Sequence, residues 1–166
     1  MNGILAAAFW ASSLITSDLS LIDSLEKGPA VGRQSINFST VQFQKENRGF
    51  EIGYNHIASV SFGPLQPSFG VSLTEMSGSW VGGGFSNNFM LSEKEFLSLS
   101  FLPGLYSKGR DVDLGGWLMF RSGIEIGSYI NEKWVISIHY DHRSSGDIWE
   151  YNPGMETIQF RLGRLL

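Results

Sequence analysis

The C-terminal stretch 140–166, YDHRSSGDIWEYNPGMETIQFRLGRLL, decides the fold because it is typical of two β-strands joined by a hairpin loop. Side chains alternate between the two faces of a strand, so residues two apart share a face. One face of the first strand, followed back before this stretch, is apolar or aromatic until it ends in a histidine and a serine: Trp134, Ile136, Ile138, Tyr140, His142 and Ser144. The opposite face is largely polar: Val135, Ser137, His139, Asp141, Arg143 and Ser145.

The final strand shows the same separation of apolar and polar faces. Glu156, Ile158, Phe160 and Leu162 share one face, and Thr157, Gln159, Arg161 and Gly163 share the other. An apolar outer face with charges on the inner face is the pattern of a barrel that meets lipid outside and encloses a polar interior. We therefore predict that both strands belong to the wall of a membrane-spanning barrel.

A histidine, a serine and a glutamate meet at the end of the apolar face of this hairpin. We expect Ser144 to pair near Glu156 and His142 near Ile158, which places the three polar groups at one rim on the lipid side. Serine is a weak nucleophile until a base takes its proton, and a carboxylate can hold the imidazole in the required tautomer. The hairpin is thus a candidate Ser-His-Glu hydrolase site that faces the membrane.

The composition bounds the class of protein. The chain has 166 residues, a net charge of -4, no cysteine and no basic run, which indicates one domain without disulfides and argues against nucleic acid as a partner. Only 17% of residues are charged, whereas a typical soluble domain has about 25%. No run of about 20 apolar residues is present, so a membrane-spanning helix is not expected. These features favour an all-β, eight-stranded antiparallel transmembrane β-barrel; a soluble β-sandwich or a lipocalin-like barrel is the alternative.

The chain divides into three segments. We expect residues 1–17 to be an export signal or the remnant of one, residues 18–32 to be an N-terminal lead-in, and residues 33–166 to be the barrel. Six strands are expected before the C-terminal pair, at residues 33–44, 49–60, 65–75, 79–91, 94–106 and 115–130. Several are about 10 residues or longer, as a tilted membrane-crossing strand requires. An even number of strands puts both termini at the periplasmic side, so the hairpin site lies at the extracellular rim.

The C-terminal motifs resemble a known family. The elements are His142-Arg143-Ser144, Asn152-Pro153-Gly154 and Glu156, and together they resemble the C-terminal signature of the outer-membrane lipid A 3-O-deacylases, the PagL family. The stretch 102–127 is also similar to the fifth and sixth strands of that family. The resemblance implies an eight-stranded barrel in the outer membrane of Gram-negative bacteria, with a Ser-His-Glu site on its outer wall. It also implies hydrolysis of the 3-position acyl ester of lipid A in lipopolysaccharide, without a metal or other cofactor.

The resemblance assigns roles to individual residues. Ser144 would attack the ester, His142 would carry the proton, and Glu156 would orient His142. Oxyanion or loop-shaping roles fall to Gly146, Asn152 and Ser145, although Ser145 stands where the family usually has Asn, and a lost oxyanion donor can lower the rate about 10²–10³-fold. Acyl chains would contact the apolar face: Trp134, Ile136, Ile138, Tyr140, Ile158 and Phe160.

Other functions stay open at this point. A non-enzymatic structural outer-membrane barrel would share the fold, and an outer-membrane phospholipase would share the chemistry. A soluble lipid-binding barrel would need an apolar interior, which the inward-facing Arg121, Glu125 and Asp141 argue against. Lipopolysaccharide and the outer membrane are the expected partners, and a homodimer is left open.

Overall fold

The computed structural model describes residues 26–27, 31–110 and 112–166. The expected export signal at 1–17 and most of the expected lead-in at 18–32 lie outside the described residues. The described part contains nine strands: β1 (Glu26–Lys27), β2 (Arg33–Phe43), β3 (Glu46–Ile57), β4 (Gln66–Thr74), β5 (Ser79–Met90), β6 (Glu95–Ser107), β7 (Leu118–Tyr129), β8 (Trp134–Ser144) and β9 (Met155–Leu165). Within these residues, no helix has the length and apolar character needed to cross a membrane.

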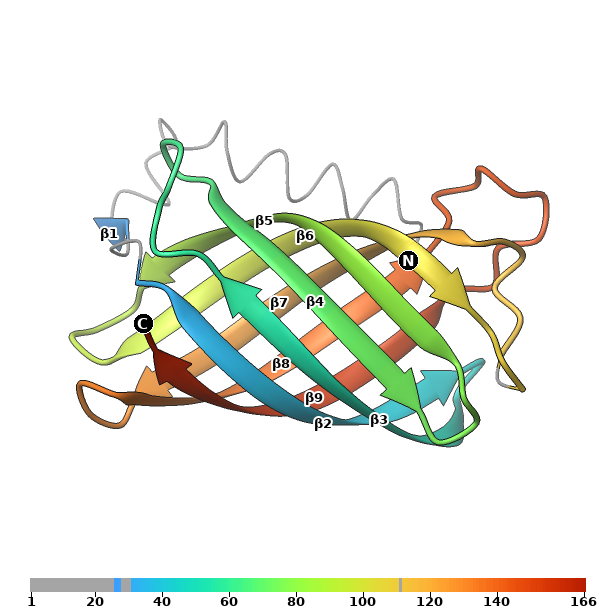
Figure 1. The fold of residues 1–166 in the computed structure, drawn as a ribbon, viewed down its shortest axis with the longest axis horizontal. Coiled ribbons are helices and arrows are strands. Elements are labelled where there is room, and N and C mark those ends of the chain that lie inside the picture. Colours follow the sequence, from blue (N-terminus) through green and yellow to red (C-terminus); the bar gives the residue numbers. More distant parts are fainter. Residues whose placement is uncertain (1–25, 28–30, 111) are drawn as a thin grey trace.

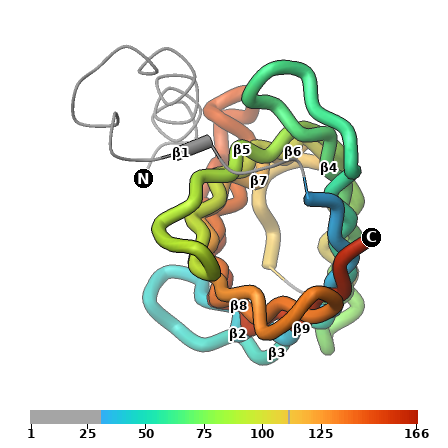
Figure 2. The backbone as a smooth tube through the Cα atoms, turned by 90° about the vertical axis from the view of Figure 1, so that its left-hand side faces the viewer, coloured from blue at the N-terminus to red at the C-terminus, as the bar shows by residue number. Residues whose placement is uncertain are grey.

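Strands β2 to β9 form a closed antiparallel barrel of eight strands (Figure 1). Each strand pairs with its neighbour in the chain, and the pairing of β2 with β9 closes the ring that Figure 2 shows end-on. The short β1 adds to β5 beside the barrel. The predicted eight-stranded antiparallel barrel is therefore confirmed.

Two strands begin three residues away from their predicted starts. The expected turn before the second barrel strand covered residues 45–49, but the structure makes a turn of only two residues, Gln44 and Lys45, with φ of 50° and 68°. Two consecutive positive φ values match the right-handed twist of the flanking strands, so β3 begins already at Glu46. The sixth predicted strand begins later than expected, at Leu118, because Gly115 packs against the backbone of Tyr151 and stays in the loop.

The two faces of the barrel wall follow the predicted alternation. Apolar side chains point outward and are strongly exposed, for example Ile36 at 58%, Phe38 at 64% and Ile138 at 62%. Arginines and carboxylates point inward and are buried, among them Arg121 and Glu125. A closed sheet has no exposed edge, so all of its backbone groups can pair within the barrel. An apolar belt around such a sheet is the outer surface of a barrel that faces the hydrocarbon of a membrane.

Ion pairs join the inward-facing charges in two groups. Glu51 accepts hydrogen bonds from Arg121 at 3.1 Å and from Arg143 at 2.9 Å. Glu125 pairs with Arg161 at 2.8 Å and with Arg33 at 3.4 Å. A buried charge without a partner is strongly destabilising, so these pairs are what allows the interior to be polar.

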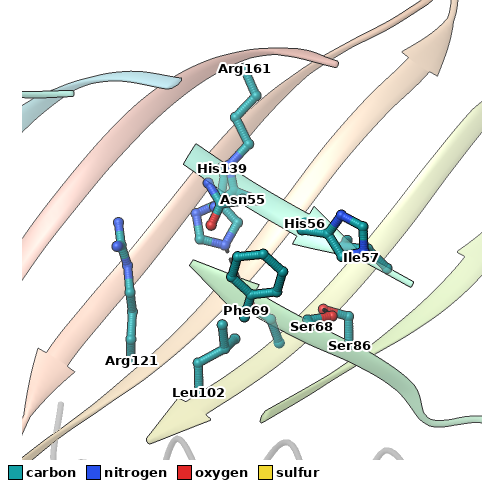
Figure 3. A pocket seen from close by; sticks show the side chains of 11 residues that line it. Asn55, His56, Ile57, Ser68, Phe69, Ser86, Leu102, Arg121, His139 and Arg161 are labelled. Atoms are coloured by element: carbon teal, nitrogen blue, oxygen red, sulfur yellow. Dashed lines mark hydrogen bonds between the residues drawn. The ribbon is translucent and has the colours of Figure 1, made fainter. Parts of the chain in front are cut away.

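The interior also contains a small cavity, which Figure 3 shows from close by. Arg121, His139 and Arg161 line it together with side chains from β3, β4, β5 and β6, and none of the three residues predicted to be catalytic lines it. His139 lies inside the barrel, as its parity predicted, with Nδ1 3.5 Å from Asp141 Oδ2. The interior is therefore a packed polar core rather than the site of the predicted chemistry.

An apolar cluster fills the interior at one end of the barrel. This is the end at which the β2–β3, β4–β5, β6–β7 and β8–β9 connections lie, and we call it the loop end; the first residue of β2 and the last of β9 pair at the other end. The cluster comprises Val41, Phe43, Trp80, Leu102, Tyr106, Val112, Leu114, Met119 and Met155. It provides a rigid support beneath the loops that carry the site described next.

Candidate active site

Adjacent strands bring the predicted histidine and glutamate face to face at the loop end. In the β8–β9 pairing, His142 lies opposite Glu156, and Tyr140 lies opposite Ile158. The predicted register, with Ser144 near Glu156 and His142 near Ile158, is wrong by two residues. The ten-residue connection 145–154 is wide enough to leave Ser144 beyond the last β8–β9 pair. A shift of two residues keeps every side chain on its face, so His142, Ser144 and Glu156 still share the outer face.

The histidine and the glutamate form the contact that the chemistry requires. His142 Nδ1 lies 3.1 Å from Glu156 Oε1, and the histidine is 4% exposed. A carboxylate at Nδ1 fixes the ring so that Nδ1 carries hydrogen and Nε2 is the basic nitrogen. The geometry therefore prepares His142 to accept a proton on its other edge.

Ser144 lies on the same face of β8, two residues beyond His142. It is 2% exposed, and its Oγ makes no hydrogen bond within the described part of the chain. On the neighbouring strand, Ser144 pairs with Phe120, whose ring stacks on Phe101 at 5.6 Å between centroids. Ser145 Oγ, the next hydroxyl in the chain, is also buried without a partner in the described residues, so two unpaired hydroxyls lie at this end of β8.

The β8–β9 loop covers this part of the wall. Gly154 approaches the histidine so closely that a Cβ built on it would lie 2.7 Å from His142 Cε1. At the other end of the loop, a Cβ on Gly146 would lie 3.3 Å from Phe120. These contacts explain why His142 and Ser144 are almost fully buried although they lie on the outer face of the wall.

Asn152 braces the same loop. Its Oδ1 accepts the Ser145 N–H at 2.9 Å, and its Nδ2 donates to Asp147 Oδ1 at 2.9 Å. Both ends of the amide are thus engaged in holding the loop, so Asn152 is suited to shaping the site rather than to donating to an oxyanion. The Ser145 N–H is also occupied, whereas the Gly146 N–H makes no hydrogen bond with the described residues.

The residues predicted to contact acyl chains continue the outer face away from the site. Ile158 pairs with Tyr140, and Phe160 pairs with Ile138, so the apolar surface runs without a break down both strands. The six side chains are all exposed, from 37% to 62%: Trp134, Ile136, Ile138, Tyr140, Ile158 and Phe160. Ile124 and Ile126 of β7 widen this surface and were not among the predicted acyl-chain contacts, although the alternation of their strand places them on the same apolar face.

Neither remaining histidine joins the site. His139 points into the barrel, and His56 stacks on Phe69 with 5.0 Å between ring centroids, on strands distant from β8 in the sheet. Within the described residues, no group of three or more His, Cys, Asp and Glu side chains is arranged to hold a metal ion. The chemical groups gathered at the loop end are therefore a base, a carboxylate and a hydroxyl.

Comparison with known proteins gives one family. The family model described as lipid A 3-O-deacylase (PagL) matches residues 42–164, a range that includes all three residues of the candidate site. No curated protein sequence matches the chain.

Solved structures are similar in fold. The crystal structure of the outer membrane enzyme PagL is 13% identical, covers 78% of this chain and 97% of its own, and superposes with a TM-score of 0.60. A de novo designed transmembrane β-barrel reaches 0.63 at 8% identity over 85% of this chain and 99% of its own. The crystal structure of Neisserial surface protein A superposes with a TM-score of 0.53 at 11% identity and covers 82% of this chain and 96% of its own. At these identities the likeness shows the barrel fold, and these neighbours are membrane barrels, which agrees with an outer-membrane location.

Proposed function

The chain belongs to the lipid A 3-O-deacylase (PagL) family, and we propose that it hydrolyses the 3-position acyl ester of lipid A through Ser144, His142 and Glu156. The observation that carries this proposal is the 3.1 Å contact between His142 Nδ1 and Glu156 Oε1, with Ser144 on the same outer face of β8. His142 and Ser144 do not hydrogen-bond each other in this structure, but an oriented base and an unpaired hydroxyl two residues apart on one face are the groups that nucleophilic acyl transfer needs. The inward-facing arginines and carboxylates of the described residues are, by contrast, already engaged in ion pairs.

The reaction on this proposal has two stages. Ser144 Oγ attacks the ester carbonyl while His142 Nε2 takes its proton, and the tetrahedral intermediate collapses as the same proton passes to the departing sugar hydroxyl. Water then attacks the acyl-serine, gives a proton to His142 Nε2, and the acyl chain leaves as a carboxylic acid when that proton returns to Ser144 Oγ. Glu156 stabilises the imidazolium in both stages, since it is the partner of Nδ1.

The oxyanion would be held by a backbone group. The Gly146 N–H is two residues from Ser144 and is not used within the described chain, whereas the Ser145 N–H is bonded to Asn152. Preorganised N–H donors aimed at the developing charge are among the largest contributions to acyl-transfer catalysis. Because the proposed oxyanion donor is the Gly146 N–H, the presence of Ser145 in place of the family's usual Asn leaves that donor intact.

Substrate access needs a movement of the loop. Ser144 Oγ is covered, so an ester carbonyl can reach it only when residues 145–154 lift from Phe120 and His142. The acyl chains of the lipid would lie meanwhile along the exposed apolar surface of β8 and β9. Because that surface faces hydrocarbon, the substrate would not have to leave the membrane.

Mass spectrometry of lipid A tests the proposal. The folded protein in detergent is incubated with lipid A, beside Ser144→Ala, His142→Gln and Glu156→Gln, with Ser128→Ala as a control on the outer face at the opposite end of β7. We expect loss of one 3-position hydroxyacyl chain with the unaltered protein and the control, and a rate at least about 10³-fold lower for Ser144→Ala and His142→Gln. No loss of mass from a folded barrel would refute the proposal, and release of fatty acid from phospholipid instead would identify a phospholipase.

A further inference from the structure

A second cavity lies at the loop end, on top of the apolar cluster rather than on the outer wall. Its volume is 280 Å³, and three connections of the barrel and the ends of β2 and β3 contribute to it. Arg48 comes from the start of β3, Met76 from the β4–β5 turn, Arg110 from the β6–β7 loop and Tyr151 from the β8–β9 loop. We call it the rim cavity; the side chains that complete it are Phe43, Val112 and Asp113.

Two guanidinium groups give the rim cavity its positive charge. Arg48 approaches Glu46 at 3.5 Å, but both side chains are largely exposed, at 47% and 71%, and such a pair is weak. Arg48 also lies over the Phe43 ring, 5.7 Å from its centroid, which holds it toward the cavity. Arg110 forms no ion pair with the described residues, and its backbone N–H is anchored to the Met76 carbonyl at 3.0 Å.

Among the described residues that line the rim cavity, Asp113 is the one carboxylate, and it is paired with Lys108. Lys108 Nζ donates to Asp113 Oδ2 at 2.6 Å, and the Gly115 N–H donates to Asp113 Oδ1 at 2.9 Å. These two hydrogen bonds hold the pKa of Asp113 below its ordinary value, so it stays ionised and engaged with Lys108. The two arginines therefore remain available to an anion from outside.

The rim cavity and the candidate active site share their boundaries. Tyr151 belongs to the loop that starts directly after Ser144 and ends directly before β9, where Glu156 is the second residue. On the other side, Phe43 follows Gln42, which pairs with Glu156 across the β2–β9 ladder. A molecule with an ester at Ser144 could thus reach over the rim of the barrel into the cavity.

We propose that the rim cavity binds a phosphate group on the sugar headgroup of the lipid whose ester reacts at Ser144. The inference rests on the proposed function and adds the part of the substrate that Arg48 and Arg110 recognise. Guanidinium groups match phosphate oxygens with two parallel hydrogen bonds, and the Tyr151 ring offers a face for a sugar. A volume of 280 Å³ is just below the range of ligand sites, about 300 to 1,000 Å³, so the cavity suits one phosphate and part of a sugar.

A kinetic comparison tests this inference. The folded protein and the double variant Arg48→Gln/Arg110→Gln are assayed in mixed micelles on lipid A and on lipid A from which the phosphates have been removed. We expect the unaltered protein to have a KM about tenfold lower for the phosphorylated lipid, with similar kcat, since one charge-assisted contact at a partly exposed site changes affinity by about that factor. The double variant should lose this preference. Arg164→Gln, which removes an exposed arginine at the opposite end of the barrel, should keep it.

A binding assay separates the inference from the catalytic proposal. Ser144→Ala protein is titrated with phosphorylated lipid A, with its dephosphorylated form and with inorganic phosphate, with and without the two arginine substitutions. Tighter binding of the phosphorylated lipid, lost in the arginine variants, supports the rim cavity even if no deacylation is seen. Equal affinity for both lipids, or displacement of the lipid by inorganic phosphate at equal concentration, would overturn it. A deacylase with no phosphate preference would leave the proposed function standing and refute only this inference.

Discussion

Replacing Gly154 by alanine should disable the site without unfolding the barrel. Gly154 has φ of 71°, and a Cβ at this position would lie 2.7 Å from His142 Cε1 and 3.3 Å from His142 Nε2. The left-handed backbone conformation costs an alanine about 1–2 kcal/mol. Since real Cβ contacts are essentially never shorter than 3.0 Å and ordinary ones begin at 3.4 Å, the ring or the loop must also move by about 0.3–0.7 Å.

That displacement falls on the nitrogen proposed to carry the proton. A misplacement of about 1 Å in a catalytic group can lower a rate about 10²-fold, so we expect kcat on lipid A to fall between 10- and 10²-fold. The barrel should stay folded, since an expected loss of about 1–2 kcal/mol is small against the stability of a closed sheet. Deacylation is followed by mass spectrometry, and folding by heat-modifiable mobility on gels and by urea unfolding.

Gly63→Ala provides a matched control. Gly63 has a similar φ of 61°, but a Cβ there would meet nothing within 4 Å, and the residue lies in the loop between β3 and β4. Both variants therefore carry the same backbone strain, and only Gly154→Ala pushes on His142. Equal activity in the two variants would refute the reasoning, because backbone strain alone would then account for any loss.

Three further changes test the loop, the interior and the outer wall. Asn152→Ala removes the acceptor of the Ser145 N–H and the donor to Asp147, so we expect kcat on lipid A to fall about 5- to 30-fold, as a loss of about 1–2 kcal/mol in the stability of the closed loop predicts. An unchanged kcat would contradict a bracing role for Asn152. Glu125→Gln leaves Arg161 and Arg33 without their carboxylate and should lower the free energy of unfolding by about 3–5 kcal/mol in urea titrations in lipid vesicles, whereas Glu132→Gln on an exposed turn should not. Ile138→Arg places a charge on the exposed face near the middle of β8 and should destabilise the vesicle-inserted barrel by about 2–4 kcal/mol, with Ile138→Leu as control; equal stability would mean that this face does not meet hydrocarbon.

The fold could be predicted because strand alternation tolerates error. Parity alone assigns Ile138 to the outside and His139 to the inside, and a boundary that is wrong by two residues leaves both assignments intact. The same tolerance keeps the predicted site residues on one face although the predicted register was wrong. His142 and Ser144 share a face in any register that preserves parity.

Contacts that depend on loop shape or on barrel closure could not be predicted. Glu51 and Arg143 are 92 residues apart in the chain and meet only because the closed barrel brings opposite walls together. The bracing role of Asn152 depends on the path of ten loop residues, which the spacing of the motif does not determine. For the same reason the sequence could not reveal that the loop covers Ser144.

A deacylase of this kind would owe its activity to one hairpin rather than to its fold. The designed barrel superposes slightly better than the PagL enzyme, with TM-scores of 0.63 and 0.60, so the wall itself is common to barrels of different origin. The groups proposed to react lie at the end of β8 and the start of β9, on either side of the loop 145–154, where the lipid-facing wall carries a base, a carboxylate and a covered hydroxyl. Burial beneath the loop removes His142 and Ser144 from lipid and water, whereas the Glu156 side chain stays 31% exposed. The loop therefore makes polar chemistry compatible with a lipid-facing surface, and substitutions that loosen it should lower activity before they lower stability.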